Sequence, residues 1–348
     1  MISSATEITK EWLEDVLEAQ ILQISTRGNT AFNSSITHLD VTYSSGVKLP
    51  RKLLVKLNSE HNGRDEIQFY RFAENMDLSM IPQHFGLGYD PQSGLSFLIL
   101  EDISETHRLA VSREQLIGLN GVPSSEHLES VVECIAQFHA AFWEHPQFGR
   151  TPVTTEMRWW YRDEEFHTKH VERRKREWAK FIEMYKDEIP QEWRVLGERA
   201  LERLPKLFES RIKPRLVSKQ ALTLSQGDCY LSQFLVPRGG SGKSYLIDFQ
   251  EISINFPTYD LVYMFATFWT REQRALHEES LLQRYQHELN RRGIQYDWKM
   301  LHDDYQLALS YMLFDPVFYA TSGSSREYWK PKMKCLVAAY QDWKCAEV

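Results

Sequence analysis

The spacing of hydrophobic and polar positions changes character several times within the first hundred residues. Residues 6–19 carry apolar side chains at helical spacing, behind threonines that can cap a helix. Alternation over residues 35–43 and an apolar run over 52–57 predict two strands, with a turn of Ser and Gly between them. Helical spacing returns over residues 63–76, and residues 96–101 predict one more buried strand. This part of the chain therefore mixes sheet and helix.

After residue 102 the pattern becomes mostly helical. Only residues 222–250 interrupt it, with two β-rich runs around a turn of Gly and Ser. The chain has 348 residues and 42% hydrophobic content, enough to bury one large core or two linked ones. We therefore predict the α+β class, with a small mixed part before a large helical part. The predicted helices span residues 125–145, 155–188, 191–211, 258–293, 297–319 and 326–344.

Composition narrows the range of partners. The net charge of −7 disfavours binding to a nucleic-acid backbone. It is compatible with a cationic small substrate, which Glu164 and Glu165 could meet, but solubility explains the charge equally well. The cysteines have no CxxC spacing, which favours free thiols in a reducing compartment. Because neither an apolar leader nor a membrane-spanning apolar run occurs, we expect a soluble, cytoplasmic protein with no membrane partner.

Candidate chemistry concentrates in residues 222–250. The two β-rich runs flank a turn at residues 237–243, so that Asp228 precedes the hairpin and Asp248 follows it. Once the chain folds back, both carboxylates can point into one space. Phosphoryl transfer needs one carboxylate to orient the attacking hydroxyl and accept its proton, and another to hold the metal that bridges the nucleotide phosphates. Gln233, five positions after Asp228, can add an amide oxygen to the metal ligands.

These stretches resemble the motifs of a known group of small-molecule kinases. Residues 225–233 (SQGDCYLSQ) resemble the HGDxxxxN catalytic loop of aminoglycoside phosphotransferases, choline kinases and ecdysteroid-kinase-like proteins. Residues 247–250 (IDFQ) resemble the metal-binding motif that follows in those families. The motifs are short, and their shared order and spacing make the resemblance specific. The other matching stretches are residues 53–57 (LLVKL), 66–71 (EIQFYR), 98–103 (LILEDI), 135–143 (IAQFHAAFW) and 257–264 (PTYDLVYM).

The resemblance implies a bilobal, protein-kinase-like fold. Residues 1–101 would form the nucleotide-binding lobe, and residues 102–348 the catalytic and substrate-binding lobe. The implied activity is ATP-dependent phosphorylation of a hydroxyl on a small molecule, with ATP or another nucleoside triphosphate and Mg²⁺ as cofactors. Asp228 is then the catalytic residue, and Asp248 and Gln233 are the metal ligands. Neither the acceptor nor the oligomeric state follows from the resemblance.

The resemblance also assigns nucleotide contacts. Lys56 contacts the phosphates with Glu66 as its ion-pair partner, whereas from the residues alone Lys56 could instead be an edge-strand lysine that reaches water. The nucleotide loop at residues 27–36 holds a single glycine, which leaves backbone amides and hydroxyls to cap the phosphates. The hinge strand supplies backbone hydrogen bonds to the base. The remaining predicted nucleotide contacts are Thr30, Ser34, Ser35, Glu101 and Ile103.

Two departures from the family motif leave a second function open. Gln226 stands where the loop usually has His, and Gln233 stands where it has Asn. The alternative is a kinase-like fold that is catalytically weak or silent and binds a nucleotide or small ligand.

Asp260, which has the character of a helix N-cap, is predicted to buttress the catalytic loop, and His139 is predicted to be a satisfied core residue. Cys229 is predicted to pack, because no His base is adjacent to it.

One further motif is a decoy. Residues 239–244 (GGSGKS) end like a P-loop, but Pro237 stands where that motif needs its first Gly, and a strand follows instead of a helix. We predict a hairpin turn there. Asp228 and Asp248 could each be an ordinary turn or strand-end aspartate, but their register with Gln233 favours catalysis.

Overall fold

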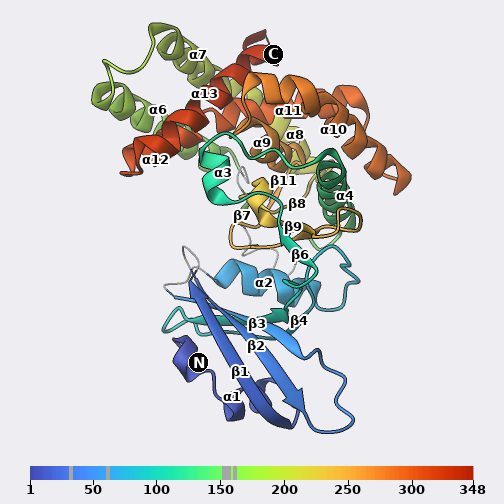
Figure 1. Ribbon diagram of the computed structural model, residues 1–348. Helices are drawn as coiled ribbons and strands as arrows, with labels where there is room; N and C mark the ends of the chain where they lie inside the picture. The colour runs from blue at the N-terminus through green and yellow to red at the C-terminus, as the bar shows by residue number, and fades with distance from the viewer. Residues whose placement is uncertain (31–33, 60–62, 151–157, 160–162, 348) are drawn as a thin grey trace.

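A computed structural model describes residues 1–30, 34–59, 63–150, 158–159 and 163–347. A sheet formed by the N-terminal part lies at one end of the molecule, and a group of helices formed by the C-terminal part lies at the other, with helix α2 between them (Figure 1). This arrangement confirms the predicted bilobal α+β fold.

The N-terminal lobe is built on a five-stranded antiparallel sheet in the order β1-β2-β3-β5-β4. The three strands predicted from sequence are confirmed as β2, β3 and β5. Strands β1 and β4 were missed because Ile21 is the only buried position among residues 21–27 of β1, and every position of β4 is only partly buried, so neither alternates. The elements are β1 Ile21–Thr30, β2 Ser35–Tyr43, β3 Lys52–Asn58, β4 His84–Tyr89, β5 Ser96–Glu101, α1 Lys10–Leu17 and α2 Arg64–Ala73.

The two faces of this sheet pack against different cores. On β5, Phe97 and Ile99 join a small cluster with helix α1, whose first turn is capped by the Thr9 side chain. Leu98 and Leu100 alternate with them and join the large core that continues through α2 into the helical lobe. The sheet therefore closes its own core on one side and meets the rest of the molecule on the other.

The C-terminal lobe is mostly helical, as predicted. Two predicted helices are each split in two: residues 258–293 form α9 and α10, and residues 297–319 fall within α11 and α12. The helices are α3 Arg113–Ile117, α4 Ser125–Ala141, α6 Glu164–Met184, α7 Gln191–Leu207, α8 Lys213–Ser218, α9 Thr258–Ala266, α10 Arg271–Arg291, α11 Trp298–Met312, α12 Asp315–Thr321 and α13 Arg326–Asp342. Within the described residues, none of them combines the length and the apolar character that crossing a bilayer requires.

Short strands between the helices carry the candidate chemistry. The predicted hairpin is formed by β9 and β10, with β6 on the other side of β9, and the stretch at residues 239–244 lies in its turn. A second small sheet has the order β7-β11-β8. Asp228 lies in the loop between β8 and β9, and Asp248 follows β10. The strands are β6 His107–Leu109, β7 Arg158–Trp159, β8 Thr223–Ser225, β9 Phe234–Pro237, β10 Tyr245–Leu246 and β11 Ser253–Asn255.

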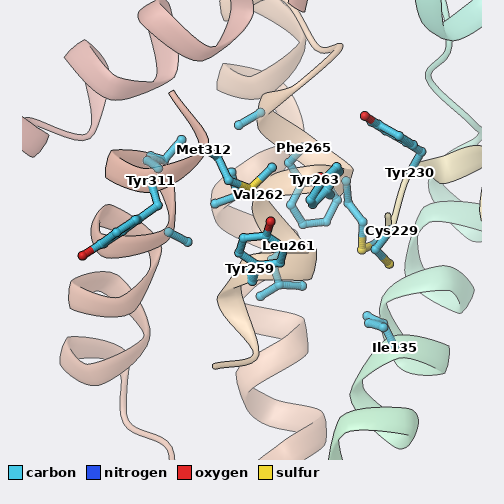
Figure 2. Close-up of a cluster of buried hydrophobic side chains, with 14 of the residues drawn as sticks. Ile135, Cys229, Tyr230, Tyr259, Leu261, Val262, Tyr263, Phe265, Tyr311 and Met312 are labelled. Carbon is cyan, nitrogen blue, oxygen red and sulfur yellow. The ribbon is translucent and has the colours of Figure 1, made fainter. Parts of the chain in front are cut away.

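Helix α9 is the centre of the helical lobe, since all nine of its residues are buried. Figure 2 shows α9 with Tyr259 and Tyr263, next to α11 with Tyr311 on one side and the loop of Cys229 and Tyr230 on the other. Cys229 is fully buried, in agreement with the predicted packing role, and all four cysteines are free thiols. The loop that carries Asp228 therefore rests on a buried helix.

Candidate active site

Lys56 joins the two lobes through a buried ion-pair cluster. It lies on β3, on the side of the sheet that faces α2, where its Nζ is 2.9 Å from Glu66 Oε2 and 2.7 Å from Asp248 Oδ1. Only 9% of the Lys56 side chain is exposed, which excludes the alternative of an edge lysine in water. The backbone N–H of Phe249 donates to Glu66 at 3.2 Å. Residues far apart in sequence thus meet around one ammonium group.

The cluster keeps Lys56 charged. Burial by itself lowers the pKa of Lys56, but the carboxylates of Glu66 and Asp248 outweigh burial and raise it above its ordinary value. A buried, charged ammonium in contact with Asp248, which lines two cavities, is suited to bind an anion such as a phosphate.

The loop that carries Asp228 is anchored by Asp260. This fully buried carboxylate accepts hydrogen bonds from the Ser225 hydroxyl at 2.6 Å, the Gln226 N–H at 2.7 Å and the Gly227 N–H at 3.0 Å. His139 Nε2 also lies 3.0 Å from it. Asp260 therefore buttresses the loop, and His139 is a satisfied core residue, as predicted. The expected N-cap role of Asp260 was wrong, because Pro257 precedes the helix and the carboxylate faces the loop.

Gln226 connects the loop before the hairpin to the segment after it, although it replaces the usual His. Its side-chain amide donates to the backbone oxygens of Ile247, at 3.2 Å, and Asp248. Its side-chain oxygen accepts from the Asp228 N–H at 2.9 Å. The glutamine thus holds the turn and fixes Asp228 and Asp248 relative to each other.

Gln233 and Asp248 form the candidate metal ligands. The Gln233 amide nitrogen lies 3.4 Å from Asp248 Oδ2, and Gln233 O accepts from the Ile247 N–H at 3.0 Å. Rotation of the amide exchanges its nitrogen and oxygen, so the oxygen can face the same point as the carboxylate. Among the described residues, no three His, Cys, Asp or Glu side chains converge as a metal site. One carboxylate and one amide fit Mg²⁺, which takes few protein ligands and completes its shell with phosphates and water.

Asp228 and Asp248 open into the same cavities. Both line a cavity of about 510 Å³ next to Gln233, and both line a second one of about 400 Å³ between α6 and α12. Burial raises the pKa of the Asp228 carboxyl well above its ordinary value, against the opposing effect of Lys332. A carboxylate of raised pKa is a better proton acceptor, and here it faces space that a substrate can enter.

The sequence and the fold both match known proteins. Residues 65–295, about two thirds of the chain, match the family described as ecdysteroid kinase-like. This chain belongs to the ecdysteroid kinase-like family. No curated protein matches its sequence.

Solved structures share the fold at low sequence identity. A Ralstonia eutropha protein assigned to the aminoglycoside phosphotransferases has a TM-score of 0.61 at 13% identity, over 98% of each chain. A mutant of aminoglycoside phosphotransferase APH(4)-Ia, in a ternary complex with ADP and hygromycin B, has a TM-score of 0.53 at 13% identity, over 95% of this chain and 97% of that one. A Cryptosporidium parvum choline kinase has a TM-score of 0.51 at 12% identity, over 98% and 90%. At these identities the likeness establishes the fold.

The predicted nucleotide contacts of this ecdysteroid kinase-like chain are only partly brought together. Ser34 lines the 510 Å³ cavity. Ser35 begins β2 and is paired with Thr30 of β1 and with Leu57 of β3, while the Thr30 side chain lies outside what the structure describes. These positions stay predictions as nucleotide contacts.

The hinge strand ends as predicted, but some of its backbone groups are already engaged. The N–H of Glu101 donates to Gln83 O at 2.8 Å, and Ile103 O accepts from the N–H groups of Thr106 and His107. Glu101 instead lines a larger cavity of about 920 Å³ beside α2 and β4. We place the chemistry in the smaller cavities, because those contain both candidate carboxylates.

Sequence reasoning missed several residues that line the cavities. Arg173 and Arg174 of α6 line the 400 Å³ cavity, and no motif of the sequence identified them. The proposed acidic contacts are elsewhere: Glu164 pairs with Lys213, and Glu165 with Lys169, both at exposed positions. No local sequence pattern separates the arginines that line the cavity from the glutamates that do not. The elements packed against α6 determine which of its faces meets the cavity.

Gly227 offers a test of how tightly the loop is held. Its φ is +90°, and a Cβ added there would lie 2.0 Å from the backbone oxygen of Glu251. Gly227→Ala should therefore destabilise the protein by about 3 kcal/mol or more, through a left-handed backbone and a clash that only backbone movement relieves. Gly323→Ala is the matched control: its φ is also +90°, but nothing lies within 4 Å, so it should cost only about 1 kcal/mol. Urea denaturation of both variants compares the two costs, and equal losses would mean that the loop is loosely held.

Proposed function

We propose that this ecdysteroid kinase-like protein is an ATP-dependent phosphotransferase that phosphorylates a hydroxyl of a small molecule. One observation carries the proposal: Asp228 and Asp248 share cavities while Lys56 contacts Asp248 from the other lobe. A proton acceptor, a metal ligand and a phosphate-binding cation are the groups that phosphoryl transfer requires. Membership of a family of small-molecule kinases supports the same reaction class.

The N-terminal lobe, residues 1–101, is proposed to bind the nucleotide. Lys56, held by Glu66, contacts the phosphates, and the end of β5 with Ile103 meets the base. Thr30, Ser34 and Ser35 are proposed to cap the phosphates from the β1–β2 connection. The lobe of residues 102–348 supplies the catalytic loop and the acceptor site. The buried free thiols support a reducing compartment, and we place the protein in the cytoplasm.

Asp248 and Gln233 are proposed to hold Mg²⁺ through one carboxylate and one amide oxygen. The ion, when bound with the nucleotide, neutralises charge on the phosphates. Gln226 keeps Asp248 in place through the backbone. Asp248 itself has a φ of +64°, a conformation that Asp tolerates better than most residues and that is frequent at functional sites.

Asp228 is proposed to accept the proton of the acceptor hydroxyl. As that proton moves to the carboxylate, the hydroxyl oxygen forms a bond to the γ-phosphorus of ATP. The bond between this phosphorus and the β–γ bridging oxygen breaks, and ADP leaves with its electron pair. The APH(4)-Ia structure is a ternary complex with ADP and hygromycin B, a precedent for a nucleotide and a second small molecule bound together to a protein of this fold.

A nucleotide-binding assay tests the metal ligands. ATP with Mg²⁺ should raise the free energy of unfolding by about 2 to 3 kcal/mol when nucleotide is roughly 100-fold above its Kd. In Asp248→Asn the magnesium-dependent part should be lost, because the amide lacks the charge that holds the ion. Asp40→Asn, at an exposed position on β2, is the control and should behave as the wild type. Thermal-shift curves with ATP, with and without Mg²⁺, measure the difference.

The same assay distinguishes the active phosphotransferase from the catalytically silent, nucleotide-binding alternative. Stabilisation of the wild type by ATP without any metal dependence, and no ADP release with a panel of hydroxylated molecules, would indicate a nucleotide-binding protein that lacks activity. Magnesium-dependent binding with acceptor-dependent ADP release supports the phosphotransferase.

A further inference from the structure

A buried lysine fills an aromatic cage beside the candidate active site. Lys332 lies on α13, and its side chain is 0% exposed. Its ammonium lies within 6 Å of the centroids of several aromatic rings, the range in which a cation is attracted to a ring face. The rings are Tyr319 at 4.7 Å, Tyr230 at 5.0 Å, Tyr263 at 5.4 Å, Tyr328 at 5.7 Å and Phe268 at 5.8 Å. We call these five rings the Lys332 cage.

The charge of Lys332 is balanced inside the protein. Its ammonium contacts the carboxylate of Asp315 on α12 and the hydroxyl of Tyr230. Burial by itself lowers the pKa of Lys332, but the Asp315 carboxylate outweighs it and raises the pKa, so that the lysine stays charged. The cage therefore holds a cation permanently, without any ligand.

The Lys332 cage forms a wall of the cavities that contain Asp228. Tyr230 follows Asp228 by two positions, and with Tyr328 and Phe268 it lines the 510 Å³ cavity. Tyr263 lines the 400 Å³ cavity, together with Asp315. Tyr319 lines both. In Figure 2, Tyr263 and Tyr230 lie next to each other, on α9 and on the catalytic loop. The cage thus lies where the acceptor of a phosphoryl group would approach Asp228.

An aromatic cage of this kind commonly recognises an ammonium group on a ligand. Here the Lys332 ammonium already occupies the centre of the cage. A cationic ligand would be repelled by the charge of Lys332, and the Asp315 carboxylate that could attract it is already paired with Lys332. Besides the carboxylates of Asp228 and Glu251, positive groups also lie at the cavities. Arg113 lies 5.9 Å above the Tyr328 ring, and Arg173 and Arg174 line the 400 Å³ cavity. The nearby carboxylate of Asp248 is engaged by Lys56.

We propose that Lys332 is a specificity-determining residue, whose ammonium occupies the cage and excludes acceptors that carry a primary or quaternary ammonium group. Removal of its side chain opens an ammonium-binding subsite lined by the same rings and Asp315. The inference rests on the proposed function in one respect, namely that the cavity binds the acceptor. The subsite itself is tested by binding, independently of turnover.

The experiment compares the wild type with Lys332→Ala by isothermal titration with tetramethylammonium and with choline. The variant should bind both on the order of tenfold or more tightly than the wild type, because the freed cage and Asp315 take the ligand cation. The uncharged choline analogue 3,3-dimethyl-1-butanol should show no such gain. Lys330→Ala, on the same helix but in a surface pair with Glu188, is the matched control and should behave as the wild type.

Two further measurements keep the proposal open to refutation if the alanine variant does not fold. The double variant Lys332→Ala with Asp315→Asn removes both charges of the pair, which is better tolerated than the loss of one partner. It should still bind tetramethylammonium more tightly than the wild type does. In the wild type itself, binding of choline that Tyr319→Leu abolishes, or phosphorylation of choline, would overturn the proposal. A folded Lys332→Ala variant with unchanged affinity would overturn it equally, whether or not the protein proves to be a kinase.

Discussion

Asp228→Asn should lower acceptor-dependent ADP release by about 10²- to 10⁴-fold, the usual contribution of a positioned proton acceptor. The amide keeps the shape of the carboxylate but cannot take up a proton. Nucleotide affinity should stay close to that of the wild type, because the groups proposed to bind the phosphates and the metal are Lys56, Glu66, Asp248 and Gln233. Steady-state assays of ADP release with an active acceptor, together with ATP titrations, measure the two quantities separately.

A control variant of another acid in the same cavity separates the loss of the proton acceptor from the loss of a negative charge. Glu251 also lines the 400 Å³ cavity, and its carboxylate contributes to the raised pKa of Asp228 after burial itself and other neighbouring charges. Glu251→Gln removes the same charge but keeps the shape of the side chain and the backbone contact of Glu251 with Gly227, so we expect a change of only a few fold. Turnover retained in Asp228→Asn, or lost equally in both variants, would contradict the role given to Asp228.

Asp260→Ala should destabilise the protein by about 3 to 5 kcal/mol, the cost of removing one partner from a buried charged cluster. The change leaves the Ser225 hydroxyl and the N–H groups of Gln226 and Gly227 without their acceptor. Each orphaned buried donor costs roughly 1 to 3 kcal/mol. Because all three donors belong to the loop that carries Asp228, activity should fall along with stability. Urea denaturation measures the first effect, and ADP release measures the second.

Asp304→Asn is the matched control for this prediction. Asp304 is as deeply buried, but it pairs with Arg215 at 2.6 Å and with the Tyr296 hydroxyl at 2.7 Å, away from the loop. Its variant should lose stability without a change in turnover per folded molecule. If the milder Asp260→Asn variant folds and turns over normally, the buttress does not position Asp228.

The glutamine at position 226 shows how a departure from a family motif can keep its structural role. A histidine there would offer two ring nitrogens, whereas the Gln226 amide donates to Asp248 O and accepts from the Asp228 N–H. One side chain thus still links the loop of Asp228 to the segment of Asp248. Gln233 differs because its role is proposed to be metal binding, so the longer side chain bears directly on activity.

The sequence by itself determined the parts of this protein that short stretches specify. Strands β2, β3 and β5 were predictable because burial on one or both faces gives a clear local pattern. The hairpin that separates Asp228 from Asp248 was predictable because its turn is marked by Gly and Ser. The pairing of Lys56 with Glu66 was implied only by resemblance, since nothing local to β3 identifies a partner on α2.

Tertiary structure alone decided the features that depend on which faces meet. Strands β1 and β4 gave no signal because few positions are buried in residues 21–27 of β1 and none in β4, and their pairing with neighbouring strands is what makes them strands. Asp260 lies on a different segment from its three consecutive loop donors, and the five rings around Lys332 come from several segments; only folding brings these groups together. A lysine on the apolar side of α13 signals a buried charge, but its counter-charge and its cage follow from the packing of α9, α12 and the catalytic loop. The physical reason is common to all of them. The spacing of hydrophobic residues along a segment indicates which of its positions are buried, whereas only long-range contacts determine which residues they are buried against.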